Sequence, residues 1–232
     1  MINKEKEEFL NKCKNYEFVK EIIDNFHKLY YYSSAIGGTW KNTFWRGVPI
    51  QKTPNDCWVY QEIINIIRPD YIIETGTKVG GSALYLADIC DIINHGEVIT
   101  IDIDKADKLP THNRIAYLTG SSTDESIIDF IKPRIANKKV MVILDSDHSK
   151  EHVLKELEIY SKMVSVGSYL IVEDTNINLF PVRGLSEVEA CLGGPLEAIK
   201  EFLKININFK IDRNCEKFYM TFSPLGFLVR IH

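Results

Sequence analysis

Four carboxylates follow two apolar, strand-like runs of the sequence. Asp145 and Asp147 come after the run KKVMVIL, and Glu173 and Asp174 come after the run SYLIV. If the two runs are neighbouring strands, like charges at short range either take up protons or require a cation. Carboxylate oxygens are hard ligands that suit Mg²⁺, Mn²⁺ or Ca²⁺ better than Zn²⁺. The sequence therefore predicts a divalent-cation site, although acidic residues also gather at loops and helix starts without binding a metal.

A glycine-containing segment follows the apolar run YII. Residues 74–82 read ETGTKVGGS, which is the spacing Glu-x-Gly-x-x-x-Gly-x-Ser. This spacing suits a ligand with an amino-acid moiety, because its ammonium can meet Glu74 while its carboxylate meets backbone N–H groups at the next helix start. The segment is neither a G-x-G-x-x-G motif nor a phosphate-binding Gly-Lys-Ser/Thr loop. A purely structural strand-to-helix turn explains it about as well.

Two further polar groups follow predicted strands. Asp102 stands 26 residues after Gly76 and directly after the run VITI. An acidic residue at about this distance accepts both hydroxyls of a ribose in nucleotide-binding folds. Ser121, Ser122 and Thr123 follow the next strand and could line an adenine pocket. Simpler explanations exist for both groups, since Asp is common at strand ends and hydroxyl residues cap helices.

Strand-like and helical patterns alternate along the chain from residue 56 onward. Short runs rich in β-branched residues predict strands at 71–77, 97–104, 115–121, 138–145 and 168–174. Apolar residues three or four apart predict helices at 56–67, 82–93, 125–135 and 151–163. This alternation implies βαβ units and a parallel sheet covered on both faces. In such sheets ligands bind beyond the carboxyl ends of the strands, which is where the polar residues above stand.

The two ends of the chain depart from this alternation. Apolar residues at helical spacing from Phe9 to Phe26 predict an amphipathic helix outside the central fold. Residues 30–54 are rich in aromatic residues, so we expect an irregular segment that either straps the core or forms a wall of the substrate site. A helix with Pro195 at its first position precedes the runs FKID and FYMTFSPLGFLVRI. These two runs predict an antiparallel edge, which dinucleotide-binding folds usually lack.

The composition is that of an ordinary globular protein, with 232 residues of which 45% are hydrophobic and 26% charged. The formal charge of −4 argues against a nucleic-acid partner, which requires clustered Lys and Arg. Five cysteines without C-x-x-C spacing predict free thiols. No stretch has the pattern of a signal peptide or a membrane span, so we expect a cytoplasmic protein with a small-molecule partner. The apolar N-terminal helix makes a homo-oligomer reasonable.

Several long segments together resemble one known family. They are TFWRGVPIQKTPNDCWVYQEII, RPDYIIETGTKVGGSALYLAD, LDSDHSKEHV, SYLIVEDTNIN, GGPLEAIKEFL and SPLGFLVRI. These segments resemble the cephalosporin hydroxylase-like family of class I S-adenosylmethionine-dependent methyltransferases, which includes sugar and rhamnosyl O-methyltransferases. The resemblance implies an α/β, Rossmann-like fold with a seven-stranded, mostly parallel sheet and an antiparallel C-terminal hairpin. We expect an N-terminal helix and aromatic segment, 1–54, packed on a methyltransferase domain, 55–232.

The resemblance also implies roles for individual residues. S-adenosylmethionine would bind through Glu74, Gly76, Thr77, Gly80, Gly81, Ser82, Asp102, Ser121, Ser122 and Asp145. A divalent metal, Mg²⁺ or Mn²⁺, would be held by Asp147, Glu173 and Asp174, with Asp145 as the alternative first ligand. His148 and Lys150 are the candidate bases, and Lys150 stands where catechol methyltransferases carry a catalytic lysine. Lys150 can equally be a solvated lysine at a helix start.

The expected activity is metal-dependent O-methylation of a sugar that is nucleotide-linked or part of a surface-polysaccharide precursor. A sugar hydroxyl is a poor nucleophile, and a divalent ion with a base favours loss of its proton. Three alternatives remain open from the residues: methylation of a hydroxyl in an antibiotic or other secondary metabolite, NAD-dependent oxidoreduction, and nucleotide binding without catalysis. The acceptor itself does not follow from the sequence.

Overall fold

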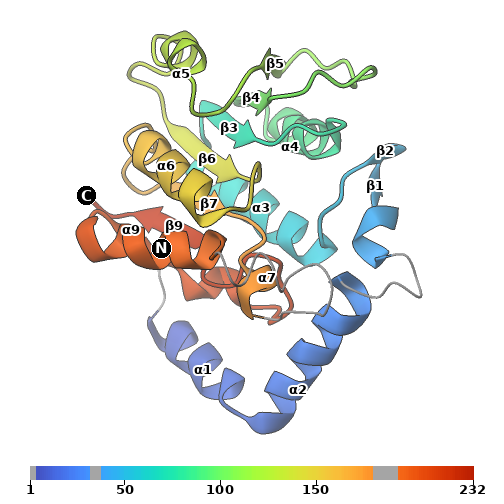
Figure 1. The fold of residues 1–232 in the computed structure, drawn as a ribbon, viewed down its shortest axis with the longest axis vertical. Helices are drawn as coiled ribbons and strands as arrows, with labels where there is room; N and C mark the ends of the chain where they lie inside the picture. Colours follow the sequence, from blue (N-terminus) through green and yellow to red (C-terminus); the bar gives the residue numbers. More distant parts are fainter. Residues whose placement is uncertain (1–3, 32–37, 180–192) are drawn as a thin grey trace.

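The core of the protein is a seven-stranded sheet with the strand order β5-β4-β3-β6-β7-β9-β8 (Figure 1). The computed structural model describes residues 4–31, 38–179 and 193–232. Strands β3 to β7 run parallel, and β9 is antiparallel to both β7 and β8. The predicted parallel sheet with an antiparallel edge is confirmed. The strands are β3 (Tyr71–Thr75), β4 (Glu97–Asp102), β5 (Ile115–Thr119), β6 (Val140–Leu144), β7 (Tyr169–Val172), β8 (Phe209–Ile211) and β9 (Phe227–Arg230).

The last strand is shorter than the sequence pattern predicts. A 3₁₀ turn at Arg213–Glu216 follows β8, and the run from residue 218 becomes a strand only at β9. Glu216 gives the reason, because its buried carboxylate accepts hydrogen bonds from the Lys14 side chain and from the backbone N–H of Leu225. A buried charge requires such partners, and they fix a turn at this point instead of an extended chain.

Helices cover both faces of the sheet. Along each central strand alternate residues face opposite sides, so that Ile72 packs with α3 and α4 whereas Ile73 packs with α5, α6 and α9. Both residues are fully buried, as expected for a parallel sheet covered on both faces. The helices are α3 (Pro54–Ile67), α4 (Gly81–Ile92), α5 (Glu125–Ile131), α6 (Lys150–Tyr160) and α9 (Pro195–Ile205).

The N-terminal residues form two helices where the sequence pattern predicts one. α1 spans Lys4–Lys14 and α2 spans Glu17–Phe26, and Tyr16 between them has an extended backbone. α2 continues into a π-helical turn at His27–Tyr31. The two helices form a V beneath the sheet in the view of Figure 1. The break allows Lys14 at the end of α1 to reach Glu216 near the C-terminus.

His27 connects these helices to the residues that follow β7. Its side chain is only 1% exposed, and its Nδ1 lies 3.3 Å from Nδ2 of Asn176 in the short helix α7 (Asn176–Leu179). Because an amide nitrogen donates, Nδ1 accepts this hydrogen bond and the ring is neutral. Burial lowers the pKa of His27 from 6.5 to about 4. Because a proton on Nδ1 would remove its contact with Asn176, we expect the docking of the N-terminal helices to weaken in acid.

We expect His27 to reduce stability between pH 6.5 and pH 4. In this range the unfolded chain binds a proton at His27 that the folded chain does not bind, so the free energy of unfolding falls as the pH falls. The pKa difference corresponds to about 3 kcal/mol once the pH is below both values. Urea unfolding of wild type and His27→Gln across pH 7 to 4 measures this contribution as the difference between the two proteins. Parallel pH profiles would contradict it.

A strap precedes α3 and crosses the start of α4. It consists of a hairpin formed by β1 (Phe44–Trp45) and β2 (Val48–Pro49) and of residues 50–53. A Cβ atom at Gly81 would stand 2.0 Å from the carbonyl oxygen of Pro49, so the two backbones touch at this glycine. Thr53 then caps α3, with its side chain accepting a hydrogen bond from Asn55 N. The strap is thereby fixed at the carboxyl edge of the sheet.

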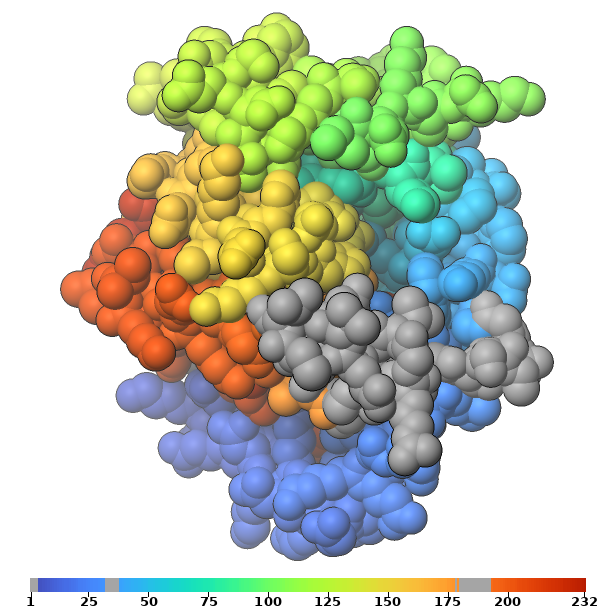
Figure 2. All heavy atoms as spheres, viewed as in Figure 1, coloured from blue at the N-terminus to red at the C-terminus, as the bar shows by residue number. Residues whose placement is uncertain are grey.

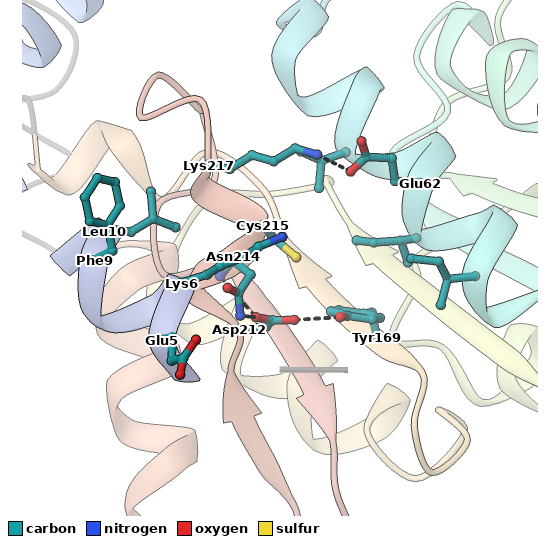
Figure 3. A pocket seen from close by; sticks show the side chains of 13 residues that line it. Glu5, Lys6, Phe9, Leu10, Glu62, Tyr169, Asp212, Asn214, Cys215 and Lys217 are labelled. Carbon is teal, nitrogen blue, oxygen red and sulfur yellow. Dashed lines mark hydrogen bonds and ion pairs between the residues drawn. The ribbon is translucent and has the colours of Figure 1, made fainter. Parts of the chain in front are cut away.

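A cavity of about 590 Å³ lies at the other end of the strands, between α1, α3 and the turn after β8. Figure 3 shows Phe9 and Leu10 on one side and Tyr169, the first residue of β7, on another. None of the site residues predicted above lines this cavity. Among the helices of the described segments, none has the length and apolar character that crossing a membrane requires.

Candidate functional site

Three side chains meet beyond the carboxyl ends of β6 and β7. Asp145 follows β6 directly, His148 is three residues further on, and Asp174 follows β7. His148 Nε2 lies 3.5 Å from Asp145 Oδ1 and 3.5 Å from Asp174 Oδ2, and one ligand atom from each residue falls within 4.8 Å of the others. Asp174 has a left-handed backbone with φ 54°, a strained conformation that is found at functional sites. Two carboxylate oxygens at this spacing fit a hard divalent cation, and the imidazole nitrogen lies beside them.

A buried lysine holds the neighbouring carboxylates together, and sequence reasoning missed it. Lys52, in the strap, is 3% exposed, and its Nζ donates to Asp145 Oδ2 at 2.8 Å and to Glu173 Oε1 at 2.6 Å. The hydroxyl of Tyr60 in α3 donates to the same oxygen of Glu173 at 2.8 Å. Glu173 is itself buried. The residues around Lys52 in the sequence do not indicate that this lysine is buried, because its partners come from distant strands.

The charged groups of this cluster shift one another's pKa values. Burial opposes ionisation of Asp145, but the Lys52 ammonium and His148 outweigh it and lower the pKa of Asp145. Burial raises the pKa of Asp174 to about 6, and the Asp145 carboxylate adds to the increase. Burial, followed by the charge of Asp145, raises the pKa of Glu173, and the Lys52 ammonium opposes this increase. Asp145 is therefore the carboxylate that stays ionised to the lowest pH, which favours it as a cation ligand.

Asp147 and Lys150 bind other partners. Asp147 is exposed, its Oδ1 accepts a hydrogen bond from Ser149 N at 2.7 Å, and its hydrogen bonds with Ser149 lower its pKa. Lys150 Nζ forms an ion pair with Glu201 Oε2 of α9 at 2.6 Å. The structure thus brings Asp145, His148, Glu173 and Asp174 into one cluster, with Asp147 and Lys150 directed elsewhere.

The residues expected to bind the methionine part of a cofactor form a buried network. Glu74 is 0% exposed, and its two oxygens accept hydrogen bonds from the hydroxyls of Ser82 and Thr100. Thr100 Oγ1 also lies 2.7 Å from Thr77 Oγ1. Burial raises the pKa of Glu74, against the effect of the nearby Lys52 ammonium. The network joins the end of β3 to the start of α4 and to β4.

Other parts of the chain pack directly against the glycines of this segment. A Cβ atom at Gly76, where φ is +90°, would lie 1.8 Å from the carbonyl oxygen of Asp145. At Gly80 it would lie 2.7 Å from Cδ of Pro110, and at Gly81 the strap is in contact as described above. Gly76 therefore sets the distance between the β3 end and the backbone of Asp145. The sequence pattern of this segment is explained either by a ligand with an amino-acid moiety or by a structural turn, and the structure shows contacts within the chain at these glycines.

We expect Gly76→Ala to destabilise the protein more than Gly167→Ala. Both glycines have positive φ, +90° and +78°, but a Cβ atom at Gly167 would meet nothing within 4 Å. Gly167→Ala should therefore cost only the backbone strain, about 1 kcal/mol. Gly76→Ala adds a clash with Asp145 and should cost at least about 3 kcal/mol. Urea denaturation of the two variants measures the difference, and equal losses would show that the contact at Asp145 relaxes freely.

The residues predicted for the nucleoside lie at the ends of β4 and β5. Asp102 is half-buried, with its oxygens accepting hydrogen bonds from Lys78 N at 2.7 Å and Asp104 N at 3.1 Å. Ser121 and Ser122 follow β5, and Ser122 is buried with its Oγ 3.2 Å from His152 Nε2 of α6. On the face shown in Figure 2, the surface is hollowed between the yellow atoms, which include α6, and the light blue atoms of the strap region.

Aromatic residues of the N-terminal segment border the cluster at Asp174. The Tyr31 side chain forms a hydrogen bond with Asp174. Its ring packs edge-on against Phe222, with centroids 4.8 Å apart, and stacks on Trp40 at 5.6 Å. Trp58, by contrast, is 58% exposed. Tyr31, with Trp40 stacked on it, is therefore placed to border a ligand at Asp174.

A second acidic group holds the strap in place. Asp88, Asp91 and His112 also have oxygen and nitrogen atoms within 4.8 Å of one another. His112 Nδ1 accepts a hydrogen bond from Arg114 N at 3.1 Å, so Nε2 carries the hydrogen and faces Asp91 Oδ2 at 3.1 Å. Asp88 accepts a hydrogen bond from Trp45 Nε1 at 2.7 Å. Protein donors satisfy these carboxylates, and they tie the β1–β2 hairpin to α4.

Comparison with known proteins gives one family over most of the chain. The family model described as Rhamnosyl O-methyltransferase/CmcI matches residues 37–231. The rhamnosyl O-methyltransferase of Mycobacterium tuberculosis (strain ATCC 25618 / H37Rv) is 37% identical over 218 residues, which cover 90% of this chain and 85% of that protein. The rhamnosyl O-methyltransferase of Mycobacterium leprae (strain TN) is 34% identical over 224 residues, which cover 93% of each chain.

Solved structures agree on the fold. The structure titled "CmcI-N160 apo-structure" superposes with a TM-score of 0.61 at 21% identity and covers 83% of this chain and 77% of its own. The structure titled "cmcI-D160 Mg-SAM" has the same TM-score at 20% identity and covers 83% of this chain and 78% of its own. At this level of identity the similarity concerns the fold alone.

Proposed function

Because the chain belongs to the Rhamnosyl O-methyltransferase/CmcI family, we propose that it transfers the methyl group of S-adenosylmethionine to a sugar hydroxyl with the help of a divalent cation. The observation that carries this proposal is the meeting of Asp145, His148 and Asp174 beyond two neighbouring strands. These groups combine cation ligands with a base, which is the combination that a weakly nucleophilic hydroxyl needs. The acceptor class is suggested by the relatives, which are named for rhamnosyl groups.

We assign the cation to Asp145, Glu173 and Asp174. Asp145 replaces Asp147 in the set expected from the sequence, because Asp147 is exposed and directed to Ser149. When bound, a Mg²⁺ or Mn²⁺ ion supplies positive charge that favours the deprotonated form of an acceptor hydroxyl. The carboxylates would fix the ion at the edge of β6 and β7.

His148 is the base in this proposal. Its imidazole is only partly exposed and lies 3.5 Å from oxygens of both Asp145 and Asp174. These carboxylates orient the ring and favour its positive charge after it takes the hydroxyl proton at Nε2. Lys150 is less suited, because its ammonium is engaged by Glu201 at the surface.

The cofactor is proposed to lie along the ends of β3, β4 and β5. Residues 74–82 would contact its methionine part, Asp102 its ribose, and Ser121 and Ser122 its adenine. Asp102 has the free acceptor capacity for this role, since each of its oxygens accepts one backbone hydrogen bond and has a second lone pair. This placement would direct the sulfonium methyl toward the region of Asp145, where the acceptor oxygen can be held in line.

A transfer assay tests the proposed function. Purified protein is incubated with methyl-labelled S-adenosylmethionine and a panel of rhamnosyl glycosides, nucleotide sugars and non-sugar alcohols, each with Mg²⁺, Mn²⁺ or EDTA. We expect label in a sugar acceptor only when a divalent ion is present. Transfer that survives EDTA would contradict the role of the cation. Transfer to non-sugar alcohols alone would contradict the acceptor class.

A further inference from the structure

The burial of Lys52 is a feature of the acidic cluster that the proposed reaction does not use. A lysine side chain at 3% exposure has lost most of its hydration, which strongly disfavours an ammonium ion unless charged partners replace the water. Lys52 has these partners in Asp145 and Glu173, and the Glu74 carboxylate is also close enough to favour its charge. The ammonium is therefore part of the electrostatic balance of the cluster.

The position of the ammonium is that of a bridging cation. Its Nζ lies 2.8 Å from Asp145 Oδ2 and 2.6 Å from Glu173 Oε1, so one positive centre joins carboxylates from two adjacent strands. The same two carboxylates belong to the set that we assign to the divalent ion. A divalent ion would therefore meet a cation that is already bound to two of its three ligands.

The attachment of Lys52 allows its ammonium to move while its backbone stays fixed. The strap is held on one side by the contact between Pro49 and Gly81 and on the other by the Thr53 cap of α3. Four methylene groups separate this fixed backbone from Nζ. Such a stem has several staggered rotamers, so we expect the ammonium to shift with less change in the structure than a movement of the strap would require.

We infer that Lys52 is an internal cation that competes with the divalent ion for Asp145 and Glu173. In the ion-free protein it offsets the repulsion between the carboxylates, and on ion binding it yields at least one of them. This inference rests on the proposed function, because it takes the divalent ion as the partner of the cluster. Its consequence is that Lys52 lowers the affinity for the ion and stabilises the ion-free fold.

Mn²⁺ binding to Lys52 variants tests the inference without measuring methyl transfer. Lys52→Gln removes the charge, Lys52→Arg retains it, and Tyr60→Phe removes a neutral donor from the same oxygen of Glu173. Free Mn²⁺ is followed by electron paramagnetic resonance during titration of each full-length protein. We expect the dissociation constant of Lys52→Gln to fall at least about tenfold below that of wild type. Lys52→Arg and Tyr60→Phe should stay within about threefold of wild type.

Thermal unfolding supplies the second readout. Ion-free Lys52→Gln should unfold at a lower temperature than ion-free wild type, and saturating Mn²⁺ should close the gap. If Lys52→Gln folds only with Mn²⁺, its affinity is measured by release of the ion to a chelator of known strength. Unchanged or weaker Mn²⁺ binding by this variant overturns the inference while leaving the proposed function intact. Failure of wild type to bind Mn²⁺ would instead contradict the proposed function, and the inference with it.

Discussion

Replacing Asp145 with Asn is expected to reduce methyl transfer by at least about a thousandfold, because a cation ligand worth several kcal/mol in the transition state is lost. Asn keeps the size of the side chain but removes the charge that pairs with Lys52 and faces His148. The affinity for Mn²⁺ should fall together with the rate. Steady-state kinetics at saturating Mg²⁺ and a Mn²⁺ titration measure the two effects.

Asp147→Asn is the matched control for this prediction. It makes the same chemical change two residues away, at an exposed carboxylate that binds the backbone of Ser149. We expect its rate and its Mn²⁺ affinity to stay within about threefold of wild type, as is usual for a surface charge. A large loss of rate and Mn²⁺ affinity for Asp147→Asn, together with a small loss for Asp145→Asn, would show that the first metal ligand is Asp147.

His148→Gln should lower kcat by about 10² to 10⁴, the range expected for loss of a general base. Gln cannot take up the proton, although it is close to His in size and retains polar atoms near Asp145 and Asp174. Lys150→Met is the control, and it should cost less than about threefold because Lys150 pairs with Glu201 at the surface. Single-turnover methyl transfer with saturating cofactor separates this chemical step from product release.

The Mn²⁺ affinity of His148→Gln decides between two roles for the imidazole. A base can be removed without a large change in ion affinity, whereas loss of a ligand would weaken binding at least about tenfold. A kcat close to that of wild type would contradict the assignment of His148 as the base. If Lys150→Met then lost activity, the base would be Lys150.

Much of the fold follows from local sequence pattern. The run VMVIL reads as a buried strand because every residue is apolar, and in β6 every residue is indeed buried. The same logic identifies the strand ends, and with them Asp145 and Asp174. These positions could be predicted because strand periodicity and the topology of α/β sheets are sufficient to place them.

Other features depend on contacts between distant parts of the chain. The break between α1 and α2 accompanies the pairing of Lys14 with Glu216, which is 202 residues away. Lys52 is buried because β6 and β7 supply its counter-charges, and neither strand is near it in sequence. Local pattern likewise does not show that Pro110 and Pro49 lie over the glycines that follow β3. These features require the tertiary structure.

Asp145, Glu173 and Asp174 are the residues that we propose hold one divalent ion beside His148. The most direct test is an anomalous difference map from crystals grown with Mn²⁺ and S-adenosylhomocysteine, measured at the manganese absorption edge. We expect one strong peak within about 2.0–2.3 Å of carboxylate oxygens of Asp145, Glu173 and Asp174. A peak at Asp147, or at Asp88 and Asp91, with none beyond the carboxyl ends of β6 and β7 would contradict this assignment.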